Sequence, residues 1–463
     1  MSIIVRDPQG QHWLIVKGAP DVIIQNSDAV QLQEKIGTML GGDLGDMLTA
    51  RPLIEAVVEN FASQALRTLA IGYRKLQPGD LERPYSELET DLTLAGIYGI
   101  IDPPRPEAIK AVTDCHSAGI RVIMITGDHA STAKAIALQM GIIDDPEALV
   151  LEGKILNSMS DEELYQQVEN SSVFARVSPE HKLRIVQALQ KHNYVVAMTG
   201  DGVNDAPALR TADIGVAMGI TGTGVSKESA DLILLDDNFA TIVEAVKEGR
   251  RIYDNIRKFI RQDLTTNVGE VSALLFAFIL VIDEPLLTLA PLMILWINLI
   301  SDGLPSLALG IDGPEENVMN RKPRAKDESF FAGRLGHTIL IRGLIMGGVT
   351  YGMFMYALSM GVEMAYAQTL AFMTLIFGQL IQVFDSRALT NIYRRNPFSN
   401  QALLWAVGGS GALSLIMVYA PFGNLLLGTL PLSAEHLGLA FLVGALPVLM
   451  LSAINDFFKI NWL

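Results

Sequence analysis

The stretch Met198-Thr-Gly-Asp-Gly-Val-Asn-Asp-Ala-Pro-Ala-Leu209 decides how the first part of this sequence is interpreted. It continues the apolar run Tyr194–Met198, which has the composition of a buried strand. A second apolar run, Arg121–Ile125, ends in the same tripeptide, Thr-Gly-Asp. Helical patterns alternate with these runs, at Ala130–Met140 and His181–Lys191. The sequence therefore predicts a parallel sheet, with two acidic turns at the strand ends where such sheets bind ligands.

The turn after the second strand has the composition of a site for a hard cation. Asp201, Asn204 and Asp205 supply two carboxylates and an amide. Mg²⁺ takes one or two carboxylates together with phosphate oxygens, which this cluster can provide. An alternative is an Asp/Gly turn that caps a helix beginning at Ala206. The upstream Thr126–Asp128 favours the first interpretation, because a hydroxyl, a backbone amide and an acid at a neighbouring strand end form a phosphate cradle.

Hydropathy separates this part from the rest of the chain. Half of the 463 residues are hydrophobic, only 18% are charged, and mean hydropathy is +0.32. Long apolar stretches begin after residue 255 or so, and a membrane crossing needs about 20 such residues. Six stretches qualify: Leu264–Ile282, Leu286–Leu309, Thr338–Met360, Ala367–Phe384, Leu403–Phe422 and Leu437–Ile454. We predict six membrane spans.

Charge sets the expected orientation and excludes one class of function. Basic residues gather in alternate loops, at Arg250–Arg261, Arg321–Arg334 and Arg387–Arg395, whereas the loops after the first, third and fifth spans contain no Lys or Arg. Basic loops stay in the cytoplasm, so both termini are expected there. The net charge of −15 opposes nucleic-acid binding. A single cysteine and the lack of a signal pattern fit a reducing cytoplasm, and the compact loops lead us to expect a bacterial plasma membrane.

Polar residues inside the first two spans form a second constellation. Asn267 and Glu270 lie three apart on the first span, and Asn298, Ser301 and Asp302 share a face of the second. Two carboxylates, two amides and a hydroxyl suit a hard cation such as Ca²⁺, whereas zinc and copper favour Cys or His. The alternative is that Asn and Ser join neighbouring helices, which explains the carboxylates poorly because buried acids are costly in a membrane.

The Met198–Leu209 stretch, together with Thr126-Gly-Asp128, Asp102-Pro-Pro-Arg105 and Lys17-Gly-Ala-Pro20, resembles the P-type cation-pumping ATPases over essentially the whole chain. The resemblance implies an α/β haloacid-dehalogenase-like cytoplasmic domain with a remnant of the nucleotide-binding domain, plus a six-helix transmembrane bundle. The expected domains are the remainder of the nucleotide-binding domain at 1–88, the phosphorylation domain at 89–248 and the transmembrane domain at 249–463.

The resemblance also assigns roles to residues of the cytoplasmic part. Asp201 would hold Mg²⁺ in a loop that Asp205 shapes, and Arg176 and Lys182 would approach the transferred phosphoryl group. Implied catalytic residues are Thr126, Asp128, Lys182, Asp201 and Asp205; implied Mg²⁺ ligands are Asp201 and Asp205; implied cofactor-binding residues are Lys17, Arg67, Thr126, Gly127, Asp128, Arg176, Lys182 and Asn204.

In the membrane, Asn267-Val-Gly-Glu270 and Trp296–Pro305 are similar to the calcium-pump branch of the family. That similarity implies that five residues are ion ligands: Asn267, Glu270, Asn298, Ser301 and Asp302. It implies export of Ca²⁺ from the cytoplasm, driven by ATP with Mg²⁺, and alternative cations are Mn²⁺ and Na⁺/K⁺. The expected partners are the lipid bilayer, ATP and the cation, and no nucleic acid.

One departure from the family changes the expected activity. No Asp-Lys-Thr-Gly-Thr sequence occurs, so the aspartate that these pumps phosphorylate has no counterpart, nor do the actuator domain and the first four spans. Without a nucleophile there is no phosphoryl acceptor, and the isolated polypeptide is not expected to pump. The missing N-terminal half of a pump is then a candidate partner. The alternatives are a truncated, non-pumping membrane protein that retains nucleotide binding and, less favoured, a stand-alone phosphatase, which needs the same aspartate.

Three further features of the spans carry predictions. Gly303 and Pro305 predict a break in helix hydrogen bonding, which is tolerated at membrane depth where it lines an ion site. Asp385 resembles the position of an acidic ligand in two-site calcium pumps, but it also lies beside Arg387, which favours a surface salt bridge equally. Gly347-Gly348 and Gly408-Gly409 predict close helix contacts.

Overall fold

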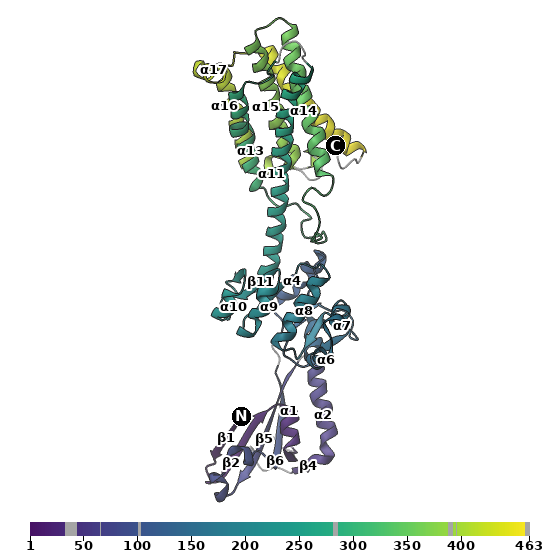
Figure 1. Ribbon diagram of the computed structural model, residues 1–463. Helices are drawn as coiled ribbons and strands as arrows, with labels where there is room; N and C mark the ends of the chain where they lie inside the picture. Colours follow the sequence, from purple (N-terminus) through teal and green to yellow (C-terminus); the bar gives the residue numbers. More distant parts are fainter. Residues whose placement is uncertain are drawn as a thin grey trace. The chain divides into compact units, whose positions relative to one another are not determined.

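The computed structural model describes residues 1–32, 44–64, 66–100, 103–280, 286–387, 392–394 and 396–458, without the side chains of Ser63, Arg67, Ser86 and Arg394 (Figure 1). The chain folds into two compact units. The first comprises Met1–Glu244 with Met319–Lys326, and the second Ala245–Val318 with Asp327–Leu463. The three described sheets lie in the first unit, and the long apolar helices lie mainly in the second.

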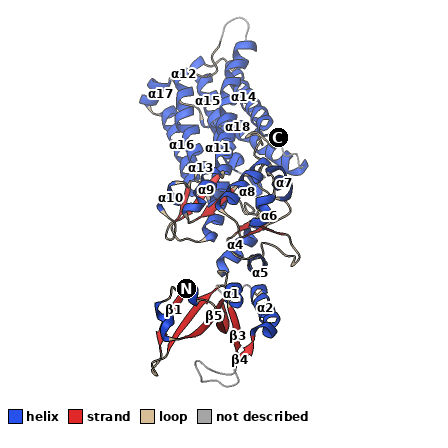
Figure 2. Ribbon diagram, turned by 60° about the horizontal axis from the view of Figure 1, so that its bottom comes forward, coloured by secondary structure: helices blue, strands red, loops and turns tan. Residues whose placement is uncertain are grey.

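A six-stranded mixed sheet opens the first unit, in the order β1-β2-β5-β6-β3-β4 (Figure 2). Its strands are β1 (Ser2–Arg6), β2 (His12–Gly18), β3 (Ser27–Gln31), β4 (Leu44–Asp46), β5 (Arg67–Leu76) and β6 (Leu92–Ile100), and its helices are α1 (Pro20–Gln25), α2 (Met47–Ser63), the 3₁₀ turn η1 (Pro78–Glu82) and α3 (Tyr85–Leu88). Within the described part of this sheet, β3 and β6 pair in parallel and the other neighbouring strands pair antiparallel. The sheet extends past the boundary expected at residue 88, because β6 is hydrogen-bonded between β5 and β3.

The following part contains two three-stranded parallel sheets, ordered β7-β9-β8 and β10-β11-β12. The strands are β7 (Met124–Ile125), β8 (Val150–Glu152), β9 (Val173–Ala175), β10 (Ala197–Gly200), β11 (Ile214–Met218) and β12 (Leu232–Leu234). The helices are α4 (Pro106–Ser117), α5 (Ala130–Met140), α6 (Gly153–Ser158), α7 (Asp161–Gln167), α8 (Pro179–Lys191), the 3₁₀ turn η2 (Val203–Asp205), α9 (Ala206–Thr211) and α10 (Gly224–Glu228). This confirms the predicted alternation of parallel strands and helices.

Helix α8 joins the two parallel sheets. Its buried Ile185 packs in the core that lies against the sheet β7-β9-β8, and the neighbouring Val186 packs in the core that lies against the sheet β10-β11-β12. Ile125, at the end of β7, and Val196, just before β10, contact both cores. The two Thr-Gly-Asp turns therefore follow strands that are anchored on the same helix.

The second unit contains the membrane helices, and six of the described helices are long and apolar enough to cross a bilayer. The first is α11 (Phe239–Leu280), which begins well before the span predicted at Leu264. The others are α12 (Pro291–Trp296), continued by the π-helical η3 (Ile297–Asp302) and α13 (Gly303–Gly310), then α14 (Leu335–Ser359), α15 (Met364–Arg387), α16 (Gln401–Tyr419) and α18 (Ala434–Phe458), with short η4 (Ile392–Arg394), η5 (Pro397–Ser399) and α17 (Pro421–Leu427) between them. The six predicted spans are confirmed in number and order.

The pairs Gly347-Gly348 and Gly408-Gly409 were expected to mark close helix contacts. Of these four glycines, Gly347 alone lies so close to a neighbouring helix that a Cβ atom would not fit among the described atoms. A Cβ atom built on Gly347 of α14 would collide with the Ser272 hydroxyl and lie 2.6 Å from the carbonyl oxygen of Gly269, both on α11. A Cβ on Gly348 would meet Phe276 at an ordinary 3.7 Å. At Gly408 and Gly409 it would meet no described atom within 4 Å, so that expectation was wrong.

Gly347→Ala is expected to destabilise the helix bundle by about 1–3 kcal/mol, because overpacking a close contact forces backbone shifts. Gly348→Ala, one residue away, should change stability by less than ~0.5 kcal/mol. Thermal unfolding of both variants in detergent, followed by helix circular dichroism, checks the difference. Equal shifts in the two variants would show that backbone contact between α11 and α14 does not depend on Gly347.

Candidate functional site

The backbone joins the loops that follow β7 and β9. The N–H of Arg176 donates to the carbonyl oxygen of Asp128 at 3.0 Å, and the N–H of Val177 donates to that of Thr126 at 3.2 Å. The Thr126 hydroxyl donates to Asp128 Oδ2 at 2.9 Å and accepts from the Asp128 N–H at 3.1 Å. Asp128, Gly127 and Arg176 are exposed at this strand end. Two of the predicted phosphate-contacting segments are therefore held together.

Asp205 organises the loop after β10. Its Oδ1 accepts a hydrogen bond from Lys182 Nζ at 2.6 Å, and its Oδ2 accepts from the N–H groups of Asp201 at 3.2 Å and Gly202 at 3.1 Å. The residue is only 5% exposed. Gly200 is needed for this packing, since a Cβ there would lie 2.5 Å from the Asp205 Cβ. Both carboxylate oxygens of Asp205 are thus engaged by the protein, and Lys182 is held beside the loop.

Asp201 has the opposite environment. Its carbonyl oxygen accepts from the Thr223 N–H at 2.9 Å and from the Ser226 hydroxyl at 3.0 Å, so its backbone is fixed. Its carboxylate is exposed and makes no hydrogen bond or ion pair with any described residue. Thr223 and Ser226 were not predicted, although Thr223 is the N-cap of α10 and Thr before a helix start is a recognisable signal.

Asp237 fixes the loop that leads to Thr223. Its carboxylate accepts from the N–H groups of Ile220 and Thr221, at 2.9 Å and 2.8 Å, and from the Thr221 hydroxyl at 2.8 Å. These bonds, led by that from Ile220, lower the pKa of Asp237 to about 2. An ionised Asp237 therefore holds this loop in place through the neutral pH range.

His181 anchors the start of α8, one residue before Lys182. Its Nδ1 accepts from the Ser178 N–H at 3.1 Å, and its Nε2 bonds to Asn157 Oδ1 at 2.8 Å, which requires a proton on Nε2. Burial, followed by the nearby Arg184 charge, lowers the pKa of His181. The Asn157 contact was not predicted, because α6 lies far away in sequence.

The stability of the first unit is expected to fall as the pH drops below about 6.5, the pKa of an unperturbed histidine. The reason is that the unfolded chain then takes up a proton on His181 before the folded chain does. Melting temperatures of the wild type and of His181→Gln between pH 5 and 8 check this, and the variant should show the flatter profile. Parallel profiles would mean that His181 is protonated equally in both states.

Lys17 and Arg67, the residues expected to bind the nucleotide, lie at one end of the six-stranded sheet. Lys17 is exposed near the end of β2, and Arg67 begins β5; the pairing of Gly18 with Ala70 places both at that end. The Arg67 side chain and Asp102 lie outside the described residues. The structure gives Lys17 no side-chain hydrogen bond or ion pair within the described part of the chain. Its role at ATP stays a prediction.

In the membrane unit, Glu270 of α11 joins three helices. Its Oε2 accepts from Asn298 Nδ2 at 3.0 Å, and its Oε1 accepts from Gln379 Nε2 of α15 at 3.1 Å. Glu270 is 3% exposed. The Gln379 amide oxygen is buried and has no hydrogen-bond partner among the described residues, so it is an oxygen that a cation can engage.

Asp302 lies at the end of the π-helical segment η3. Its Oδ2 accepts from the Thr266 hydroxyl at 2.6 Å and its Oδ1 from Gln262 Nε2 at 3.5 Å. The predicted irregularity is confirmed, although it takes the form of a π segment before Gly303, and such segments are frequent at functional sites. Gln262 and Thr266 were missed; the available signal was that Gln262, Thr266 and Glu270 follow one another at intervals of four residues.

Two predicted ion ligands have other partners. Asn267 Nδ2 donates to Asp263 Oδ2 at 3.3 Å on the same helix. The Ser301 hydroxyl lies 3.4 Å from the Ser414 hydroxyl of α16, which also accepts from Trp296 Nε1 at 3.1 Å. Their role as ligands stays a prediction. No group of three or more His, Cys, Asp or Glu gathers anywhere in the described ranges, so the candidate cation site mixes carboxylates with amides and hydroxyls.

Asp385 corrects one expectation. It is 3% exposed and pairs with Arg261 Nη2 and with Arg342 Nη1, each at 2.6 Å, while the Ser452 hydroxyl of α18 also bonds to it. It is therefore not a surface salt bridge, and its partner is not Arg387, because residues two apart face different sides of a helix. Arg387 pairs instead with Asp312 at 3.0 Å.

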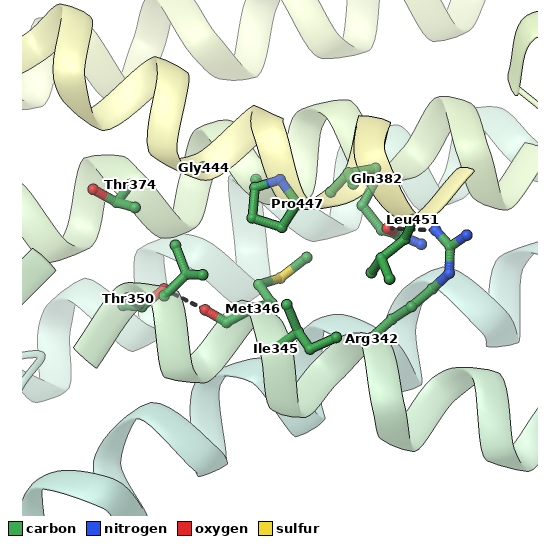
Figure 3. A pocket seen from close by; sticks show the side chains of 12 residues that line it. Arg342, Ile345, Met346, Thr350, Thr374, Gln382, Gly444, Pro447 and Leu451 are labelled. Atoms are coloured by element: carbon green, nitrogen blue, oxygen red, sulfur yellow. Dashed lines mark hydrogen bonds between the residues drawn. The ribbon is translucent and has the colours of Figure 1, made fainter. Parts of the chain in front are cut away.

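Arg342 also borders a cavity of about 10 Å³ between α14, α15 and α18, room for about one water molecule (Figure 3). The cavity is lined mainly by apolar groups, among them Met346, Pro447 and Leu451. At one end Arg342 Nη1 donates to Gln382 Oε1 at 3.3 Å.

Comparison with known proteins supplies independent evidence. A family model described as haloacid dehalogenase-like hydrolase matches residues 27–213, and one described as cation transporting ATPase, C-terminus, matches residues 286–457. These two matches confirm the predicted fold class.

Curated relatives match nearly the whole chain. A calcium-transporting ATPase of Bacillus subtilis is 47% identical over 98% of this chain and 50% of that protein. A cation-transporting ATPase of Synechocystis is 38% identical over 95% of this chain and 48% of that protein. A calcium-transporting ATPase of Listeria monocytogenes is 41% identical over 85% of this chain and 43% of that protein. The chain spans about half the length of these relatives. It is an integral membrane protein, and it belongs to the P-type cation-transporting ATPases, in the branch of the calcium pumps.

Proposed function

We propose that this chain provides the phosphorylation domain and part of the ion-binding site of an ATP-driven pump that exports Ca²⁺ from the cytoplasm. The observation that carries the proposal is the pair of buried carboxylates in the six-helix unit, Glu270 and Asp302, which accept hydrogen bonds from amide and hydroxyl side chains. Hard cations take such ligands. The relatives from Bacillus subtilis and Listeria monocytogenes bear the name of calcium-transporting ATPases.

Mg²⁺ and ATP are the proposed cofactors. The exposed Asp201 carboxylate fits Mg²⁺, which keeps several waters and takes one or two carboxylates, whereas Asp205 is engaged by Lys182 and backbone N–H groups. When bound, Mg²⁺ would screen phosphate charge. Lys182 supplies a further positive charge at this loop, and Thr126 and Asp128 present a hydroxyl and an acid at the end of β7 in the other parallel sheet. Asn204 and Arg176 are proposed to contact phosphate oxygens.

We further propose three domains, with the nucleotide-binding remainder extended to residue 100, because β6 belongs to that sheet. Both termini are proposed to face the cytoplasm of a bacterial cell. The N-terminal half of a pump is the proposed partner, because the aspartate acceptor sequence is not in this chain.

The test uses the purified 463-residue chain in detergent and measures equilibrium binding of radioactive Ca²⁺, nucleotide binding, and acid-stable labelling by radioactive ATP. We expect saturable binding of Ca²⁺ and nucleotide without labelling. Co-expression with the N-terminal half of the Bacillus subtilis relative should then give labelling that Ca²⁺ stimulates. Nucleotide binding without Ca²⁺ binding, and without labelling in the co-expressed pair, would instead support a non-pumping membrane protein.

A further inference from the structure

Asp385 joins two guanidinium groups inside the membrane unit. One carboxylate there faces two guanidinium groups, since Asp385 Oδ2 lies 2.6 Å from a nitrogen of both Arg261 and Arg342. Arg342 is 2% exposed, so water cannot screen its charge. A buried charge of this kind is costly unless further polar groups stabilise it.

A chain of hydrogen bonds leads from this charge to the candidate cation site. Arg342 Nη1 donates to Gln382 Oε1 at 3.3 Å, and Gln382 Nε2 donates to Ser386 Oγ at 3.3 Å. Ser386 Oγ donates to Gln262 Oε1 at 2.9 Å, and Gln262 Nε2 donates to Asp302 Oδ1 at 3.5 Å. Gln382, Ser386 and Gln262 are each at most 1% exposed. We call this series, from Arg342 to Asp302, the relay.

Every donor in the relay points the same way, from the cation towards the carboxylate. This direction follows from the two ends: a guanidinium group can only donate, and an ionised carboxylate can only accept. Turning either amide round would place N–H groups of Gln382 against those of Arg342, or the amide oxygen of Gln262 against a carboxylate oxygen of Asp302. Hydrogen bonds aligned in one direction polarise and strengthen one another, especially where water is excluded.

We propose that Arg342 is a positioning residue of the cation site and acts through the relay on Asp302. The relay holds Asp302 Oδ1 against Gln262 while Thr266 holds Oδ2, so the carboxylate is oriented before a cation arrives. A ligand that is already oriented loses less conformational freedom on binding. Asp385 thus serves the site by keeping Arg342 in place, at a distance from the cation. This inference rests on the proposed cation binding, yet the relay itself can be tested without a cation.

The first experiment measures Ca²⁺ affinity of the purified full chain by equilibrium binding. Ser386→Ala interrupts the relay, and Arg342→Gln removes its source while Asp385 keeps Arg261 as partner. Each should raise the Kd about tenfold, within the range of coupling through contiguous side chains, and the double variant should show about the same tenfold rise. Ser386→Thr, which keeps a hydroxyl, should restore the affinity.

Ser452→Ala is the matched control, since it also removes a buried hydroxyl near Asp385 but lies outside the relay. Its Kd should stay within about twofold of the wild type, the range expected of a site that does not couple. A hundredfold rise in the double variant, which means independent effects, or an equal loss in Ser386→Ala and Ser452→Ala, would overturn the relay.

The second experiment needs no cation. Melting temperatures in the presence of a Ca²⁺ chelator are measured for Arg342→Gln, for Asp302→Asn and for the variant with both changes. Sites without direct contact normally give additive shifts, whereas the relay predicts a combined shift clearly smaller than the sum. Additive shifts would overturn the relay whatever the Ca²⁺ result. If the shifts of the variants are non-additive and the wild-type chain binds no Ca²⁺, the relay is upheld and the proposed cation is rejected.

Discussion

Asp302→Asn is expected to weaken Ca²⁺ binding by at least about 100-fold, equivalent to ~2.7 kcal/mol. Asp302 is 1% exposed and contributes a charged oxygen that an amide replaces only in part. The affinity of hard-cation sites in proteins is set largely by the number of charged ligands, so the loss of one of two buried carboxylates is severe. Equilibrium binding of radioactive Ca²⁺ to the purified chain provides the measurement.

Ser301→Ala, at the neighbouring position, tests whether the predicted ligand Ser301 contributes to Ca²⁺ binding. The Ser301 hydroxyl lies 3.4 Å from that of Ser414, and within the described ranges it makes no hydrogen bond with Glu270 or Asp302. We expect its Kd to stay within about threefold of the wild type, a difference of less than ~0.7 kcal/mol. If Ser301→Ala loses as much affinity as Asp302→Asn, the cation engages the face of η3 that packs on α16.

Asp205→Ala should be the most damaging single change in the cytoplasmic part, lowering the free energy of unfolding of the first unit by about 3 kcal/mol. The substitution leaves the Lys182 ammonium group and the N–H groups of Asp201 and Gly202 without their acceptor. We place the effect at the low end for broken buried pairs because Lys182 is 22% exposed. Urea unfolding followed by fluorescence measures the loss.

Asp201→Asn separates folding from metal binding in the same loop. Its carboxylate is exposed and has no partner in the described part of the chain, so stability should change by less than ~0.5 kcal/mol. Binding of Mg²⁺ with nucleotide to this variant should nevertheless weaken strongly. In Asp205→Asn, by contrast, the main effect should be a loss of stability. Equal destabilisation by Asp201→Asn and Asp205→Ala would show that both acids organise the loop.

The local patterns were good predictors where the interacting residues are close in sequence. Helix α5 begins and ends at the predicted residues, and α8 begins two residues earlier than predicted because Ser178 caps it. Strands were less accurate: β10 covers Ala197–Gly200, not Tyr194–Met198, since pairing with β11 sets its bounds. Strand β6 pairs with β5 and β3 although it lies past the boundary expected at residue 88, and a strand's partners are not readable from its own composition.

The candidate sites divide in the same way. Composition and spacing identified Asp201, Asp205, Glu270 and Asp302, because clustered acids after a strand or within an apolar span are rare and expensive. They did not separate the exposed carboxylate of Asp201 from the engaged carboxylate of Asp205. That difference arises from Lys182, which the fold brings to the loop from 23 residues away.

By itself, then, the sequence determined the α/β part and the six spans and singled out the acidic residues of both candidate sites, because hydropathy, periodicity and short motifs are properties of neighbouring residues. Only the tertiary structure decided which of these acids has partners within the described part of the chain, as Asp205, Glu270 and Asp302 do, and which has an exposed carboxylate without one there, as Asp201 does. Asp385 finds Arg261 and Arg342 on two other helices, and Asp302 finds Gln262 across the bundle. A buried charge is satisfied by whatever group the packed helices bring within hydrogen-bond reach, and that reach is independent of separation along the chain.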